Sequence, residues 1–186
     1  MLRMGESSIL AEPRSHISLG ASGRLGNRSV EVIGRVRYDY GRGQWDEWFI
    51  EDERGGFGWL VEDEKEFTLE SPIPKLPAGI HADLKAGEVL GHADSQWEVR
   101  EVGVGRCVGV EGQVRRAARV GEMVRFIDLA EVGGGLRMSV EFTEDGRGEA
   151  FVGRVLRPEQ VRLSGVAAPP SAGVAAQTIR LSLIHI

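Results

Sequence analysis

Short runs in which apolar and polar residues alternate, separated by glycines, recur along most of the chain. The 26 glycines are spread among these runs instead of forming a cluster. Alternation of this kind gives a β-strand one apolar and one polar face, whereas an amphipathic helix repeats about every three to four residues. Because helical spacing is scarce, the sequence predicts an all-β fold of short antiparallel strands.

The clearest strand pattern begins at Leu136. Leu136, Met138, Val140 and Phe142 alternate with polar residues, and the turn sequence "EDGRG" separates them from the apolar "AFVGRVL". This arrangement predicts a hairpin over residues 136–155 in which those four side chains are buried.

Residues 30–40 alternate in the same way, and their even-numbered positions are expected to face inward. "SSILAEP" near the start and "PEQVRL" near the end are expected to form at most short helices. Further strands are expected in "WFIED", "FGWLVE", "EFTL", "EVLGH", "QWEVREV", "RCVGVEGQV" and "EMVRFIDL".

Residues 71–79, "SPIPKLPAG", contain three prolines, which cannot donate hydrogen bonds to a neighbouring strand. This stretch is therefore expected to be a linker between a first β half (18–70) and a second β half (80–163). Each half is predicted to form a small antiparallel sheet or SH3-like barrel. Residues 1–17 are expected to be an N-terminal leader, and residues 164–186 a flexible tail whose final "LSLIHI" is interpreted as non-native.

Charge and cysteine content exclude several classes of protein. The 23 basic and 28 acidic residues give a net charge of −5, which argues against nucleic acid or an anionic membrane as a partner of the whole surface. Cys107 is the only cysteine, so the chain forms no intrachain disulfide and no cysteine metal cage. The apolar runs are too short to cross a bilayer, and the N-terminus lacks the apolar core of a secretory signal. We therefore expect a cytoplasmic protein with no membrane insertion, cofactor or bound metal.

The stretch "RYDYGRGQWDEWFIEDERGGFGWLVEDE" contains three of the four tryptophans among many carboxylates. Its alternation predicts two strand turns with an aromatic face, so we interpret it as a structural or interaction motif. The residues of this motif are Arg37, Tyr38, Trp45, Glu47, Trp48 and Trp59.

A tight turn at "GRGQ" predicts how the two strands of this motif pair. Tyr38 is expected opposite Glu47, which places Glu47 on the aromatic face and makes it important for stability. Trp48 is expected across from Arg37, where indole and guanidinium can stack. Asp46 is expected in water, so Asp46→Ala should cost little and Glu47→Ala more.

Signatures of catalysis are weak in this sequence. There is no phosphate-binding P-loop or nucleophile elbow, and "GVGRCVG" misses the dinucleotide fingerprint by one residue. Cys107 lies in an alternating strand and is interpreted as a core thiol, so no catalytic residue is predicted. The carboxylates at 46–47, 51–53 and 62–66 are interpreted mainly as solvated turn residues, although they could supply acid–base groups or a hard-cation site. A carboxylate- or cation-dependent enzyme is therefore the runner-up.

A second alternative is single-stranded nucleic-acid binding through a basic loop, since small β-barrels bind single strands in this way. The candidate basic patch comprises Arg115, Arg116, Arg119 and Arg125. A solvated connector is the favoured interpretation, because the rest of the chain is acidic.

Five stretches resemble a bacterial family known as domain of unknown function 4178. They are "LGASGR" (19–24), "VIGRVRYDYGRGQWDEW" (32–48), "WLVEDE" (59–64), "WEVREVGVGRCVGVEGQV" and "LRMSVEFTEDGRGEAFVGRVL". Relatives often carry a zinc ribbon before this domain, which this chain lacks, and a different turn where it has "GQVRRA". The family offers no catalytic residues to carry over, and its genes neighbour envelope-stress genes. The resemblance thus implies a non-catalytic, cytoplasmic β-rich module that binds an unidentified protein, linked to envelope stress.

Overall fold

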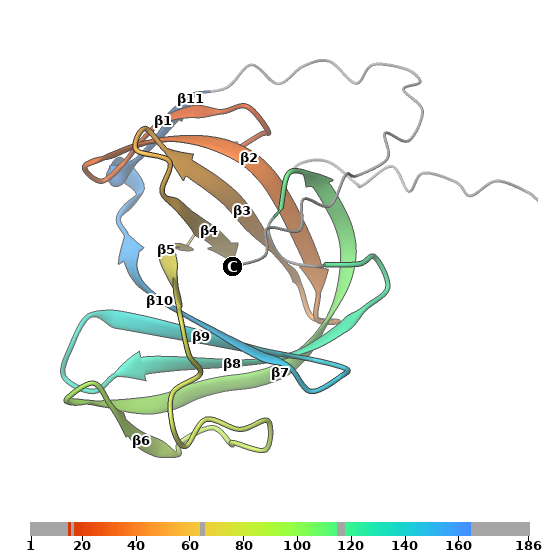
Figure 1. Ribbon diagram of the computed structural model, residues 1–186, viewed down its shortest axis with the longest axis vertical. Coiled ribbons are helices and arrows are strands. Elements are labelled where there is room, and N and C mark those ends of the chain that lie inside the picture. The colour runs from red at the N-terminus through yellow and green to blue at the C-terminus, as the bar shows by residue number, and fades with distance from the viewer. Residues whose placement is uncertain (1–14, 16, 64–65, 115–117, 165–186) are drawn as a thin grey trace, which may run out of the picture.

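The computed structural model describes residues 15, 17–63, 66–114 and 118–164, and its described part is all-β (Figure 1). A single 3₁₀ turn, η1 (Pro158–Gln160), lies where the sequence predicts a short helix. "SSILAEP" and the tail 165–186 lie outside the described residues. The strands are β1 (Ser22–Leu25), β2 (Arg28–Asp39), β3 (Gln44–Asp52), β4 (Phe57–Asp63), β5 (Glu66–Ile73), β6 (Val89–His92), β7 (Ser95–Gly112), β8 (Met123–Glu131), β9 (Leu136–Thr143), β10 (Gly148–Leu156) and β11 (Val161–Ser164).

The strands form one antiparallel sheet that closes into a barrel. The order around the barrel is β2-β3-β4-β5-β10-β9-β8-β7, and β7 pairs back onto β2. β1 and β11 extend the sheet beyond β2, and β6 extends it beyond β7. Figure 1 shows these two extensions on opposite sides of the barrel.

The expectation of two separate SH3-like halves is not confirmed. β5 pairs with β10 and β2 pairs with β7, so four neighbouring strands from each half join at two edges to close a single barrel. Residues 71–73 of the expected linker belong to β5, where Pro72 lies opposite Phe151. β4 pairs with β5 only as far as Glu70, so Pro72 lies where β5 has lost one neighbour and needs no donor on that side.

Glycines allow the backbones of β2 and β7 to approach closely where the two strands pair. Gly34 and Gly112 lie opposite each other, and Gly112 has φ +66°, a conformation that side chains other than glycine rarely adopt. A Cβ atom at Gly34 would overlap the carbonyl oxygen of Gln113, and one at Gly112 would overlap that of Ile33. The backbones therefore approach as closely as they do because neither residue has a side chain.

A bulge between Val32 and Gly34 changes which face of β2 is apolar. Before the bulge, Val30 and Val32 pack outside the barrel, and after it Val36 and Tyr38 pack inside. The prediction of one continuous inward face over residues 30–40 is therefore wrong, because the extra residue reverses the alternation.

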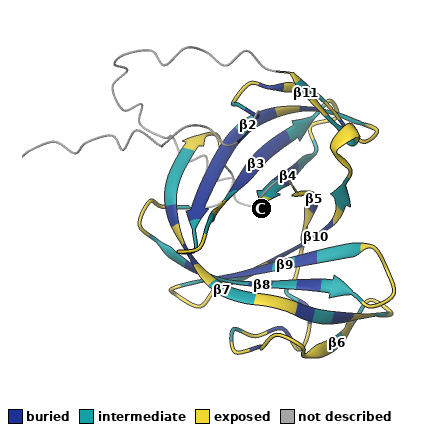
Figure 2. Cartoon of the chain, turned by 180° about the vertical axis from the view of Figure 1, so that it is seen from behind, coloured by how far each residue is buried: buried dark blue, intermediate teal, exposed yellow. Residues whose placement is uncertain are grey.

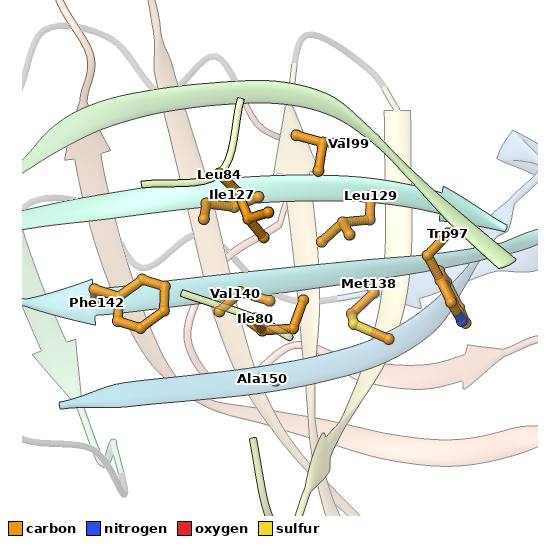
Figure 3. Close-up of a cluster of buried hydrophobic side chains, with 10 residues drawn as sticks. All are labelled: Ile80, Leu84, Trp97, Val99, Ile127, Leu129, Met138, Val140, Phe142 and Ala150. Atoms are coloured by element: carbon orange, nitrogen blue, oxygen red, sulfur yellow. The ribbon is translucent and has the colours of Figure 1, made fainter. Parts of the chain in front are cut away.

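Two apolar layers cover the outside of the barrel. One includes Trp48, Ile50 and Leu60 beneath β1 and β11. The other covers β7 to β10, where Ile80 and Leu84 pack on the strands (Figure 3). The barrel is thus apolar on much of its outer wall, and β3 is buried along most of its length (Figure 2).

The predicted hairpin at residues 136–155 is confirmed by the pairing of β9 with β10. Met138, Val140 and Phe142 are buried in the outer layer shown in Figure 3, and Leu136 is half-buried at its edge. The two strands predicted at "QWEVREV" and "RCVGVEGQV" are one long strand, β7. No helix in the described part of the chain is long and apolar enough to cross a membrane.

Candidate functional site

The interior of the barrel holds a cavity of about 250 Å³. Its lining comes from β3, β4, β5, β7, β8, β9 and β10, so the cavity exists only because the barrel is closed. Aromatic rings form part of its wall and carboxyl groups another part. Its size suits a small molecule or a cluster of waters.

The aromatic wall is centred on Trp45 of β3. Its indole stacks on Tyr38 with ring centroids 4.7 Å apart and meets Phe126 edge-on at 5.2 Å. Trp59 and Phe151 meet edge-on at 6.5 Å on another part of the wall. Ring faces carry partial negative charge, so such a wall attracts cations as well as apolar groups.

Two glycines of β7 make room for this wall. A Cβ atom at Gly103 would overlap the ring of Phe126, and one at Gly105 would overlap the indole of Trp45. These are glycines of the "GVGRCVG" stretch that resembled an incomplete dinucleotide fingerprint. The structure shows that they serve aromatic packing against the strand.

Glu70 of β5 is the most deeply buried carboxyl group of the cavity, with 3% of its surface exposed. The Ser139 hydroxyl donates a hydrogen bond to Glu70 Oε1 over 2.6 Å. Burial, reinforced by the charges of Asp128 and Glu141, raises the pKa of Glu70 from 4.5 to about 8 against the effect of that hydrogen bond. Glu70 is therefore mostly protonated at neutral pH.

Asp128 of β8 lies beside Ser139 across the β8–β9 ladder. Burial raises its pKa from 3.8 to about 7, and the charges of Glu101, Glu141 and Asp63 act in the same direction. Neighbouring carboxylates in this part of the barrel thus raise one another's pKa, so each favours the protonated form of the others.

Other charged residues complete the lining. The Trp45 indole N–H donates to Glu47 Oε1 over 3.0 Å, which ties the carboxyl and aromatic walls together. Arg100 and Arg137 are the basic residues in the described lining. The remaining acidic residues of the lining are Asp63, Glu66, Glu101 and Glu141. Acidic groups therefore outnumber basic ones, and the cavity favours a positively charged occupant.

The residues of the predicted motif separate onto two faces of the barrel wall. Trp45, Glu47 and Trp59 line the cavity, and Tyr38 packs behind Trp45. Arg37 and Trp48 lie on the outer face. Sequence reasoning therefore found part of the aromatic wall and placed Trp48 and Arg37 correctly on the other face from Glu47.

The predicted pairing in this motif is shifted by two residues, because Tyr38 lies opposite Trp45 and Val36 opposite Glu47. Trp48 accordingly lies across from Arg35, whose guanidinium carbon stands 4.7 Å from its ring centroid. The stacking was thus predicted correctly, but with the wrong arginine. Trp48 also donates its indole N–H to Glu62 over 3.0 Å.

The expectation that Asp46 lies in water is wrong. Asp46 is 6% exposed and pairs across the ladder with Arg37. Arg35 and Arg37 each donate two hydrogen bonds to its carboxylate, at 2.7 to 2.9 Å. Burial raises the pKa of Asp46, and the hydrogen bond and charge of Arg35 offset part of that rise. The four hydrogen bonds from Arg35 and Arg37 stabilise the ionised carboxylate.

The candidate basic patch is not a continuous surface in the described residues. Arg115 and Arg116 lie outside them, and the backbone N–H of Arg119 donates to Glu122. Arg125 of β8 donates to the backbone carbonyl of Ala82. This bond holds the segment around Ile80 and Leu84 against the outer wall. Cys107 is buried inside the barrel core, as predicted.

The carboxylates predicted to lie in turns do so only in part. Asp52 accepts backbone N–H groups of Arg54 and Gly56 in the β3–β4 turn. Asp63 and Glu66, however, lie at strand ends that line the cavity. Among the described residues, no group of three His, Cys, Asp or Glu side chains is arranged to hold a metal ion.

The family described as domain of unknown function DUF4178 matches residues 18–158, which is most of the chain and includes all the strands of the barrel. The chain belongs to this family. No curated protein and no solved structure matches it. The DUF4178 match includes every strand that lines the cavity, so the cavity is a feature of the family domain in this chain.

Sequence reasoning missed the deepest part of the DUF4178 barrel site. Ser139 and Glu141 are among the polar residues that alternate with the predicted buried face of 136–142, and Glu70 and Asp128 were not singled out. The available signal was that several strands carry both an apolar face and an acidic face. In a barrel covered from outside, the acidic face points inward.

Proposed function

We propose that this protein binds a small organic cation inside its β-barrel. The observation that carries the proposal is the barrel cavity whose wall joins aromatic rings to clustered carboxyl groups. Aromatic faces and carboxylates both attract an ammonium group, and partial burial of the cavity wall strengthens both attractions.

In this proposal, the bound cation and protons compete for the carboxyl groups of Glu70 and Asp128. Glu70 and Asp128, with pKa values of about 8 and 7, hold protons near neutral pH when no cation is present. An ammonium group beside them favours the ionised form and lowers those pKa values. Binding should therefore release protons, and the affinity should rise with pH up to the pKa of Glu70.

Isothermal titration calorimetry with phenethylamine tests this proposal. The neutral 2-phenylethanol and the anionic 3-phenylpropionate are matched in shape and should bind more weakly. Repeating the titration in buffers of different ionisation enthalpy measures the protons released. Stronger binding of the alcohol or the acid, or no proton release, contradicts the proposal.

Glu70→Gln identifies the site of binding in that experiment, because it keeps the shape and the Ser139 contact but removes the ionisable group. It should weaken phenethylamine binding by about tenfold, or 1.4 kcal/mol. Glu31→Gln, an exposed carboxylate on β2 outside the cavity, is the control and should leave the affinity unchanged. Equal losses in both variants would mean that net charge, not the cavity, attracts the amine.

A carboxylate-dependent enzyme is the second candidate function. A general acid that works near neutral pH needs a raised pKa, and the pKa of Glu70 is raised to about 8. Mass spectrometry of amine, ester and glycoside probes after incubation separates the two functions, because a binding protein returns its ligand unchanged.

The role as a non-catalytic protein-interaction module concerns the outer surface and is compatible with a ligand inside the barrel. Its support is a groove on the outer wall, over β5 and β10, whose lining includes five arginines. The proposed link to envelope stress rests on family resemblance alone. Single-stranded nucleic acid is the least supported alternative, since Arg125 is engaged with Ala82.

A further inference from the structure

A groove of about 930 Å³ lies on the outer wall over β5 and β10. Its floor includes apolar side chains from the borders of both outer layers. Leu136 and Val152 pack against one layer, and Leu69 and Leu156 against the other. The groove therefore follows the seam at which the two covering layers leave the barrel wall uncovered.

Arginines surround this apolar floor. Arg24, Arg154, Arg157 and Arg162 are exposed, and Arg28 is partly buried. Glu159 is the acidic residue in the described lining. Arg157 pairs with Glu159 at 3.3 Å and Arg28 pairs with Asp52 at 2.8 Å. The groove is thus a basic patch on a chain whose net charge is −5.

From this pattern we propose that the groove docks an acidic protein segment with interspersed apolar side chains. This proposal specifies the partner class for the protein-interaction role of the outer surface and does not depend on the ligand of the cavity. Guanidinium groups bind carboxylates through two parallel hydrogen bonds, which supplies attraction and orientation at the rim. The apolar floor can bury aliphatic side chains of the same segment.

Nucleic acid fits this groove less well than an acidic polypeptide. Single strands are held by stacking their bases on aromatic side chains in addition to phosphate contacts. The described lining of the groove contains aliphatic residues and no aromatic ring. The four apolar floor residues would have no matching surface on a sugar–phosphate backbone.

Fluorescence anisotropy with a labelled peptide of repeated Asp-Leu-Glu-Val units tests the proposal. The native chain should bind it saturably, and an Asn-Leu-Gln-Val peptide should bind at least about tenfold more weakly, since it lacks the charges. Absence of saturable binding, or equal binding of the uncharged peptide, overturns the proposal.

Two double variants with the same change in net charge identify the surface. Arg24→Gln with Arg154→Gln removes two exposed arginines of the groove and should raise the peptide Kd by about tenfold or more. Arg54→Gln with Arg106→Gln removes two exposed arginines elsewhere and should change the Kd by less than about twofold. Equal loss in both double variants would mean unspecific attraction and overturn the proposal.

The other occupants of the groove are measured in the same way. Tighter binding of oligothymidylate or of phosphatidylglycerol vesicles than of the acidic peptide, lost in the groove variant, would assign the groove to nucleic acid or to a membrane. A concentration-dependent dimer that the groove variant abolishes would assign it to a second copy of this chain. Urea unfolding of the groove variant is the further control, because a free energy of unfolding close to that of the native chain shows that the barrel is folded.

Discussion

Asp46 and Glu70 are both buried carboxyl groups of one barrel wall, yet their surroundings differ. Asp46 lies on the outer face and accepts four hydrogen bonds from two guanidinium groups. Glu70 lies on the inner face, where it accepts the Ser139 hydroxyl and faces other carboxyl groups beside a cavity. The first charge is compensated by the fold, whereas the second is left for protons or for a ligand to neutralise.

The difference between Asp46 and Glu70 indicates that the outer face of the wall serves stability and the inner face suits binding. A compensated ion pair fixes how β2 and β3 pair, because each guanidinium must reach the same carboxylate. A cluster of carboxyl groups around a cavity destabilises the folded state as its members ionise, so its persistence suits a binding site. Four predictions test this contrast.

Removal of the outer carboxylate should have the largest effect. Asp46→Ala leaves two buried guanidinium groups without their acceptor and should lower the free energy of unfolding by about 3–5 kcal/mol. Urea unfolding at neutral pH measures this loss. Asp39→Ala changes a half-buried carboxylate at the end of β2 that accepts the Gly41 backbone N–H; it is the control and should cost much less. A small loss for Asp46→Ala would mean that the arginines are satisfied by water, and the contrast with Glu70 would disappear.

Removal of the inner charge should stabilise the protein at high pH. The pKa of Glu70 is raised from 4.5 to about 8 on folding, so the folded state binds more protons than the unfolded state between those values. The contribution of Glu70 to stability is therefore present below its unfolded pKa and is lost as pH rises through about 8. Glu70→Gln mimics the protonated form and should gain about 1–3 kcal/mol over the native chain at about pH 8.5.

Urea unfolding from about pH 5 to about pH 9 checks this second prediction. The difference between Glu70→Gln and the native chain should grow with pH, and the exposed Glu31→Gln should show no such trend. A Glu70→Gln variant that loses stability at high pH would show that the inner carboxylate is compensated like Asp46.

The same contrast explains which parts of the structure could be predicted from sequence. Strand positions and most side-chain faces follow from alternation, as the β9–β10 hairpin shows. The pairing of Tyr38 with Trp45 could not be fixed, because either register keeps the same residues on each face and differs only in turn geometry. The environment of Asp46 depends on that two-residue shift, since only the observed register brings Arg37 opposite it.

The closure of the barrel was beyond a reading of local patterns. β2 meets β7 through residues far apart in the chain, and no alternation within either strand records the partner. The inner position of Ser139 and Glu141 follows from this closure, because an open sheet would leave that face in water. The candidate site was therefore predictable only for the aromatic residues of β2, β3 and β4, which are consecutive in the chain, and not for Phe126 or Phe151.

A third, smaller effect is expected for the hydroxyl that contacts Glu70. Ser139→Ala removes a donor that favours the ionised carboxylate and should cost about 0.5–1.5 kcal/mol when Glu70 is charged. The loss should be larger at about pH 8.5 than at about pH 5, where Glu70 is protonated and can donate its own proton elsewhere. A loss that is independent of pH would mean that Ser139 acts only through packing.

The smallest effect on stability is expected at Glu47, where the contrast is sharpest. Glu47 lies next to Asp46 in sequence, and the alternation of β3 puts the two carboxyl groups on opposite faces of the wall. Glu47→Gln keeps an oxygen that can accept the Trp45 indole N–H, so the free energy of unfolding should change by less than about 1 kcal/mol. The affinity for phenethylamine should nevertheless fall, because the variant removes a carboxylate from the cavity wall.

Urea unfolding and calorimetry on the same preparation separate the two effects. A Glu47→Gln variant that unfolds as easily as Asp46→Ala, with unchanged amine affinity, would mean that both carboxylates serve the fold and that the cavity lies outside the function.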